Sequence, residues 1–171
     1  MREPKRKIEA TSEHHLTIDG RKWRRTDPSI PEAFRQQLVN ELMSARRAVS
    51  AALRASDALA ERAARDRVQD AKIALGERGA VWWEQASEAE RKVRAAATIR
   101  ALLRQRAPDK TICPSDVARA IGGETWRASM QLIRDVAEEL VEAGTIEVRQ
   151  KGKVVKARPL KGPLRLGLRD P

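Results

Sequence analysis

The sequence predicts a mainly α fold. We expect an N-terminal antiparallel helical hairpin, with a possible short β-hairpin arm, and a C-terminal winged helix-turn-helix with a small β-wing. Three observations predict it. Apolar residues recur at helical steps of three and four, and aromatic residues are only 3% of a chain that is 41% apolar. A glycine pair also separates two helical segments ahead of a basic, β-rich end.

The length and the charge suggest two small units and a polyanionic partner. A chain of 171 residues is long enough for two small domains, which we expect to follow a mobile tail at 1–14: a β-arm with helical hairpin at 15–82, and a winged helix at 83–171. The net charge is +11, and residues 92–171 carry 17 basic against 9 acidic side chains. A basic partner surface therefore belongs mainly to the C-terminal half.

The arm and the first long helix follow from local signals. In LTIDGRKW, apolar residues flank Asp19-Gly20, a pair that tolerates the positive φ angles of a tight turn, so a small β-hairpin or an extended arm fits. The spacing of Ser29 and Glu32 is that of a capping box, and Pro31 suits a first helical turn. Apolar residues from Phe34 onward predict a helix of about six turns.

A second helix follows after a short turn. Ser56-Asp57 is a capping pair, and Gly76 ends the pattern, so the two helices should pack antiparallel. The apolar stripe of this second helix is mostly alanine, so another copy of the chain or the third helix has to complete the core. We expect Trp82-Trp83 to form a hydrophobic clasp over the end of the hairpin.

The C-terminal order predicts the winged helix-turn-helix. Ser87 and Glu90 start a helix with capping-box spacing, and Thr111 to Cys113 read as a short strand. A helix over 114–121, the corner Gly122-Gly123 and a longer helix over 125–143 follow. Strand signals then resume at Thr145 around a Lys151-Gly152 turn. In the longer helix the spacing assigns these residues to a buried face: Trp126, Met130, Ile133, Ala137 and Leu140.

The candidate DNA-binding residues lie on the longer helix and on the basic wing at 149–158. The stripe beside the buried face contains Arg127, Gln131 and Arg134, side-chain types that read guanine and adenine in a major groove. The same spacing also fits an ordinary solvated face. The wing supplies cations that would contact phosphates with little sequence information: Arg149, Lys151, Lys153, Lys156 and Arg158.

Other kinds of chemistry have little support in the residues. His14-His15 have no second ligand cluster, and Cys113 has no histidine near it in sequence, so we expect no metal site, no cofactor and no catalytic site. The N-terminus lacks the apolar core of a secretory signal, and no apolar run approaches the roughly 20 residues that span a bilayer. We expect a cytoplasmic protein associated with the nucleoid.

Two resemblances add to this interpretation. Through TICPSDVARAIG, Trp126-Arg127, IEVRQKG and KGPLRL, residues 95–169 resemble a bacterial winged-helix family labelled as a domain of unknown function. That resemblance implies the fold and no activity; this chain has Lys156-Ala157 where the family usually has Asp-Pro, which makes the wing more basic. The N-terminal half resembles small actinobacterial proteins labelled as a Tol biopolymer transporter, through IDGRKWRRTDPSIPE, ARRAV, ARDRV, AKIALGERG and WWE. That label has no weight without a membrane segment.

The expected function is therefore non-catalytic binding of double-stranded DNA, in transcriptional regulation or nucleoid association. The helix at 125–143 would face the major groove, and the wing would lie on the phosphate backbone. One alternative is a protein-interaction or scaffold module, because a winged helix does not by itself fix function. RNA binding comes third, and the N-terminal hairpin is a possible site of homo-oligomerisation.

Overall fold

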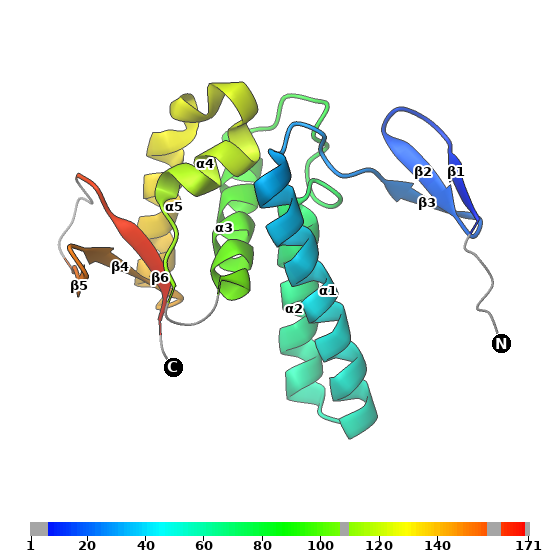
Figure 1. The fold of residues 1–171 in the computed structure, drawn as a ribbon, viewed down its shortest axis with the longest axis horizontal. Coiled ribbons are helices and arrows are strands. Elements are labelled where there is room, and N and C mark those ends of the chain that lie inside the picture. Colours follow the sequence, from blue (N-terminus) through cyan, green and yellow to red (C-terminus); the bar gives the residue numbers. More distant parts are fainter. Residues whose placement is uncertain (1–6, 107–109, 157–161, 170–171) are drawn as a thin grey trace.

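The computed structural model describes residues 7–106, 110–156 and 162–169, and it is mainly helical with two small antiparallel sheets. The helices are α1 (Glu32–Ala55), α2 (Ala58–Ala74), α3 (Glu88–Gln105), α4 (Pro114–Gly122), the 3-10 helix η1 (Gly123–Ser129) and α5 (Met130–Glu142). The strands are β1 (Ile8–Ala10), β2 (His15–Ile18), β3 (Arg21–Arg24), β4 (Ile146–Gln150), β5 (Lys153–Val154) and β6 (Arg165–Leu168). The helices lie between the two sheets (Figure 1). None of the described helices is long and apolar enough to cross a membrane.

The N-terminal arm is a sheet of three strands. The turn at Asp19-Gly20 has positive φ at both residues and joins β2 to β3, as the sequence predicts. β1 pairs with the other side of β2, and it lies inside the segment that we expected to be a tail. The physical reason is apolar pairing across the strands: Ile8 stands opposite Ile18, and Ala10 opposite Leu16.

The α1–α2 hairpin has the predicted antiparallel form, but the N-terminus of α1 is capped differently from the prediction. Ser56 adopts a left-handed conformation that turns the chain, and the Asp57 side chain accepts the amide hydrogen of Ala60 and so caps α2. The capping box expected at Ser29 is absent, because Pro31 is the N-cap residue of α1. The Ser29 hydroxyl instead donates to Asp27 Oδ1 at 2.6 Å.

Arginine–carboxylate pairs join neighbouring helices. Arg67 of α2 donates two hydrogen bonds to the buried Glu41 of α1, which raises the pKa of the Arg67 guanidinium. Arg100 and Arg104 of α3 both donate to Asp70 of α2, at 2.6 to 2.9 Å. Each pair leaves a buried carboxylate with charge-assisted partners, which offsets the cost of removing it from water.

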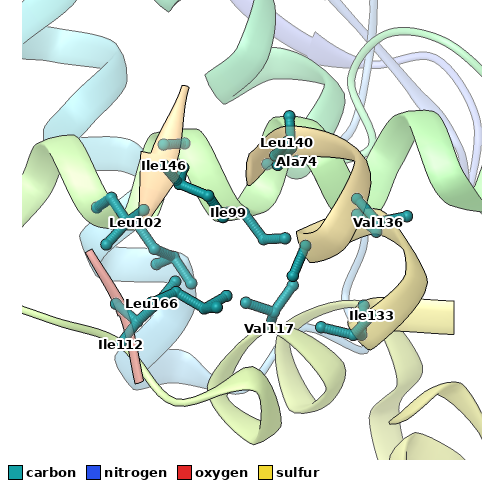
Figure 2. Packing of buried hydrophobic residues seen from close by; sticks show 14 of the residues in the cluster. Ala74, Ile99, Leu102, Ile112, Val117, Ile133, Val136, Leu140, Ile146 and Leu166 are labelled. Atoms are coloured by element: carbon teal, nitrogen blue, oxygen red, sulfur yellow. The ribbon is translucent and has the colours of Figure 1, made fainter. Parts of the chain in front are cut away.

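One hydrophobic cluster continues across the domain boundary expected at 82–83. Ala71, Ala74 and Leu75 at the end of α2 belong to the same cluster as Ile99 and Leu102 of α3. Figure 2 shows the α3 side chains meeting residues of α4, α5, β4 and β6: Val117, Ile133, Val136, Leu140, Ile146 and Leu166. α3 therefore covers the C-terminal end of the α2 stripe, from Ala71 to Leu75, and the third helix is one of the two partners that the sequence left open.

The long helix expected over 125–143 begins later than predicted. Residues 123–129 form η1, and α5 proper begins at Met130. Thr125 has non-helical angles, with φ at −94° and ψ at 17°, and its hydroxyl donates to the Gly122 carbonyl at 3.1 Å. That local bond competes with the helical hydrogen-bond pattern. Of the expected buried face, Ile133, Ala137 and Leu140 are buried, while Trp126 and Met130 are half-buried.

The C-terminal sheet has the strand order β5-β4-β6. Val148 pairs with Leu166, and Leu166 also forms an isolated bridge with Ile112. The short strand expected at Thr111 to Cys113 is therefore reduced to this single bridge. The side chains of Val148, Leu166 and Ile112 are all buried. The sheet thus closes over the end of α3 and leaves the β4–β5 turn projecting at its edge.

Candidate nucleic-acid interface

The β4–β5 turn presents lysines to solvent. Lys151 and Gly152 both have positive φ, and the pairing of Gln150 with Lys153 makes the turn as tight as two residues allow. Lys151, Lys153 and Lys156 are exposed, and none has an acidic partner in the part of the chain that the structure describes. Their charge is thus available to a polyanion.

Two predicted wing residues do not add to this surface in the same way. Arg149 is half-buried and pairs with Glu147, so its charge is neutralised within β4. Arg158 lies outside the described residues.

Contacts with the segment at 162–163 join the predicted helix stripe to the expected wing. Arg134 of α5 donates to the Gly162 carbonyl at 3.3 Å, and Gln150 of β4 donates to the Pro163 carbonyl at 3.2 Å. Gln131 is exposed one turn earlier on α5, where its amide donates to Asp135 at 2.7 Å. Arg134 and Gln131 therefore lie on a face of α5 that continues onto the residues preceding β6.

Arg127 lies on η1, and the sequence interpretation missed its neighbour on α4. Two guanidinium groups contact the Trp126 ring: that of Arg127 lies 4.5 Å from the ring centroid, and that of Arg119 lies 4.7 Å from it. Both arginines are exposed. Arg119 could have been predicted from the sequence, because it lies in the last turn of the helix before the corner, on the side away from the buried Val117 and Ala118.

The C-terminal half of α5 is acidic, which limits where a polyanion can approach. Lys92 of α3 binds Glu139 at 2.8 Å, and this hydrogen bond raises the pKa of the lysine. Asp135, Glu138 and Glu142 add further negative charge to the same helix. The exposed cations away from this acidic half include Arg119 of α4, Arg127 of η1 and the lysines of the β4–β5 turn, and it is there that a polyanion would be attracted.

The histidines of the N-terminal segment lie against the tryptophan pair. His14 stacks on Trp83 with ring centroids 4.2 Å apart and meets Trp82 edge to face. Trp82 donates to the Arg25 carbonyl at 2.9 Å, close to the end of α2 at Gly76, so it has the predicted position of a clasp. Partial desolvation and the nearby charges of Lys22, His14 and Arg24 lower the pKa of His15. No group of side chains able to hold a metal ion occurs among the described residues.

Comparison with known proteins identifies an uncharacterised domain in the C-terminal part of the chain. Residues 92–169 match the model of a family described as "Protein of unknown function (DUF3253)". The match begins within α3 and ends just after β6, so it includes the helix corner, the β4–β5 turn and all the candidate residues. No curated protein matches the chain.

Proposed function

We propose that residues 83–171 form a winged helix that binds double-stranded DNA, and that its role is binding rather than catalysis. Residues 149–158, which include the β4–β5 turn, are the wing, and η1 with α5 is the recognition element. The process that we propose is transcriptional regulation or nucleoid association. One observation carries the proposal: three exposed lysines without acidic partners among the described residues lie on the wing, Lys151, Lys153 and Lys156.

The contacts of Arg134 and Gln150 support a joint surface for helix and wing. Both side chains donate to carbonyls at 162–163, so this segment joins β4 to the N-terminal half of α5, which supports a wing on the same side as that helix. We assign the phosphate contacts to the wing lysines, and Arg127, Gln131 and Arg134 to the major-groove side. Affinity then comes mainly from the wing, and any sequence preference comes from the helix.

The test is a fluorescence anisotropy titration of a mixed-sequence duplex at several salt concentrations. Changing Lys151, Lys153 and Lys156 to Ala should weaken binding at low salt at least tenfold. Three lost phosphate contacts should reduce the slope of log K against log salt by about 3. The matched control changes Arg47, Arg54 and Arg62 to Ala, three exposed arginines of the α1–α2 hairpin, so the net charge falls equally.

Two outcomes contradict the proposal: no measurable duplex affinity at low salt, or the same loss in the wing variant and in the hairpin control. An RNA duplex in the same titration separates the RNA alternative, because its deep, narrow major groove excludes a helix. Tighter binding to the RNA duplex than to the DNA duplex would replace the DNA assignment.

A further inference from the structure

A cavity of about 450 Å³ lies at the helix corner, away from the wing. It is lined by the loop after β3, the loop that contains Trp82, the first turns of α3, and the segment from the corner at Ile121 to Leu132 at the start of α5. Its volume falls within the roughly 300–1,000 Å³ of small-molecule sites. Because its walls come from four separate segments, the cavity exists only in the assembled fold.

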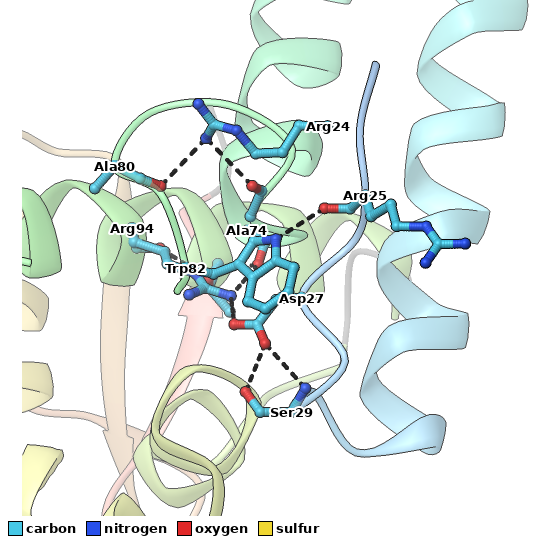
Figure 3. A network of polar contacts seen from close by, with 10 residues as sticks. Arg24, Arg25, Asp27, Ser29, Ala74, Ala80, Trp82 and Arg94 are labelled. Carbon is cyan, nitrogen blue, oxygen red and sulfur yellow. Dashed lines mark hydrogen bonds and ion pairs between the residues drawn. The ribbon is translucent and has the colours of Figure 1, made fainter. Parts of the chain in front are cut away.

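One wall of this cavity is apolar and is held in place. Trp82, Ile121 and Leu132 line it together with small side chains. The Trp82 indole is fixed by its hydrogen bond to the Arg25 carbonyl (Figure 3) and by close approach to Gly76, where an added Cβ would lie 3.0 Å from the ring. An apolar body of a ligand therefore has a preformed surface to pack on.

The base of the cavity is a neutralised ion pair. Arg94 donates to Asp27 Oδ2 at 2.8 Å and to the Ala74 carbonyl, while Asp27 Oδ1 accepts from Ser29 (Figure 3). The lining also contains Glu84, Glu124, Glu90 and Arg91. Glu90 accepts the Ser87 hydrogen bonds and keeps its charge, while Glu84, Glu124 and Arg91 have no side-chain ion-pair or hydrogen-bond partner among the described residues. Three carboxylates thus stand against one guanidinium outside the Asp27–Arg94 pair. The charge that remains free for a ligand is thus mainly negative.

Two of the three hydroxyl groups of the lining favour the same kind of ligand, while the third, on Ser129, can donate as well as accept. The Ser29 hydroxyl uses its hydrogen on Asp27, and the Thr125 hydroxyl uses its hydrogen on the Gly122 carbonyl. Each hydroxyl oxygen can then only accept a hydrogen bond from a ligand. The unpaired carboxylates and the hydroxyls of Ser29 and Thr125 together favour a ligand that donates hydrogen bonds and carries positive charge.

We propose that this cavity binds a small organic amine, with its apolar body on Trp82, Ile121 and Leu132 and its ammonium group toward Glu84 and Glu124. The cavity lies apart from the proposed wing and can be occupied without DNA, although Glu124 and Leu132 of its lining belong to η1 and α5. The chain as a whole carries a net charge of +11 and repels cations, so binding of an amine has to come from this local arrangement.

Isothermal titration calorimetry on the full chain tests the proposal with two matched probes. Tryptamine and indole-3-acetate share an indole body and differ in the sign of the charged group. We expect tryptamine to bind at least tenfold more tightly. Changing both Glu84 and Glu124 to Gln should weaken tryptamine binding about tenfold, since each exposed ion pair contributes a few-fold at most. Both are exposed, so the variant should fold, as checked by its thermal melt.

The control is Glu88→Gln, an exposed first-turn residue of α3 that does not line the cavity. It removes the same kind of charge nearby and should leave tryptamine binding unchanged. The proposal is overturned if tryptamine does not bind, if indole-3-acetate binds as tightly, or if the Glu84 and Glu124 changes have no more effect than Glu88→Gln.

Discussion

At the scale of single residues, Asp27 is the residue of the loop after β3 whose side chain makes the most hydrogen bonds and ion pairs. It is buried, it accepts from the Ser29 amide and hydroxyl, and it pairs with Arg94 of α3. Through Arg94 it also reaches the last turn of α2, where the Ala74 carbonyl accepts from the same guanidinium. One carboxylate thus joins the arm to both neighbouring helices.

Asp27→Ala should therefore destabilise the whole chain. It leaves the largely buried Arg94 guanidinium without its counter-charge, and breaking such a pair costs about 3 kcal/mol in the free energy of unfolding. Urea unfolding followed by circular dichroism measures this change. Asp66→Ala, which removes an exposed carboxylate from α2, should change stability by less than about 0.5 kcal/mol. Equal effects of the two changes would contradict the role assigned to Asp27.

At the scale of elements, the start of α3 is determined by local chemistry. Ser87 and Glu90 form a complete capping box, in which the Ser87 hydroxyl accepts from the Glu90 amide and the Glu90 carboxylate accepts from Ser87. These hydrogen bonds lower the pKa of Glu90. The helix therefore begins where the spacing of serine and glutamate predicts.

Ser87→Ala should lower the free energy of unfolding by about 1 kcal/mol, because it leaves an amide at the start of α3 without its acceptor. Thermal melts of the variant measure this change. Ser50→Ala, at an exposed position within α1, should be neutral or slightly stabilising, because alanine is the better helix former. A Ser87→Ala protein as stable as the Ser50→Ala protein would show that the box contributes nothing.

How far the sequence predicts each element depends on whether its causes are local. The α2 cap at Asp57, the α3 capping box and the turn at Lys151-Gly152 depend on neighbours within a few residues, and all are present as predicted. The start of α5 was misjudged because Trp126 and Met130 continue the helical spacing, while the Thr125 hydroxyl bond interrupts the helix. Strand β1, which the sequence did not predict, depends on a pairing between residues further apart, Ile8 with Ile18 of β2.

The candidate site, too, is predictable from the sequence only where its features have local causes. The exposure of Lys151, Lys153 and Lys156 is a property of a short basic hairpin, which the sequence predicts. The contact of Arg134 with Gly162 and the flanking of Trp126 by Arg119 are contacts between separate elements. The cavity at the corner is formed by residues that no spacing rule brings together, among them Ser29, Trp82 and Thr125.

At the scale of the whole molecule, the shared core should make the chain unfold as one unit. Ala71, Ala74 and Leu75 lie in the same cluster as the α3 side chains, so removing residues 1–82 exposes an apolar face of α3. We expect the full chain to melt in a single transition, and residues 83–171 alone to melt at a lower temperature and to bind an apolar dye. Equal melting temperatures would show that the C-terminal part is stable without the hairpin.

α3 packs against α1 and α2 on one side and against α4, α5 and β6 on the other. Seven of its residues are buried: Ala95, Ala97, Thr98, Ile99, Ala101, Leu102 and Leu103. Three of them are alanines, where a larger side chain would have to displace a neighbouring element. In a library of random substitutions, the middle of α3 should accept the fewest replacements, and the exposed tip of the hairpin between Leu53 and Leu59 should accept the most.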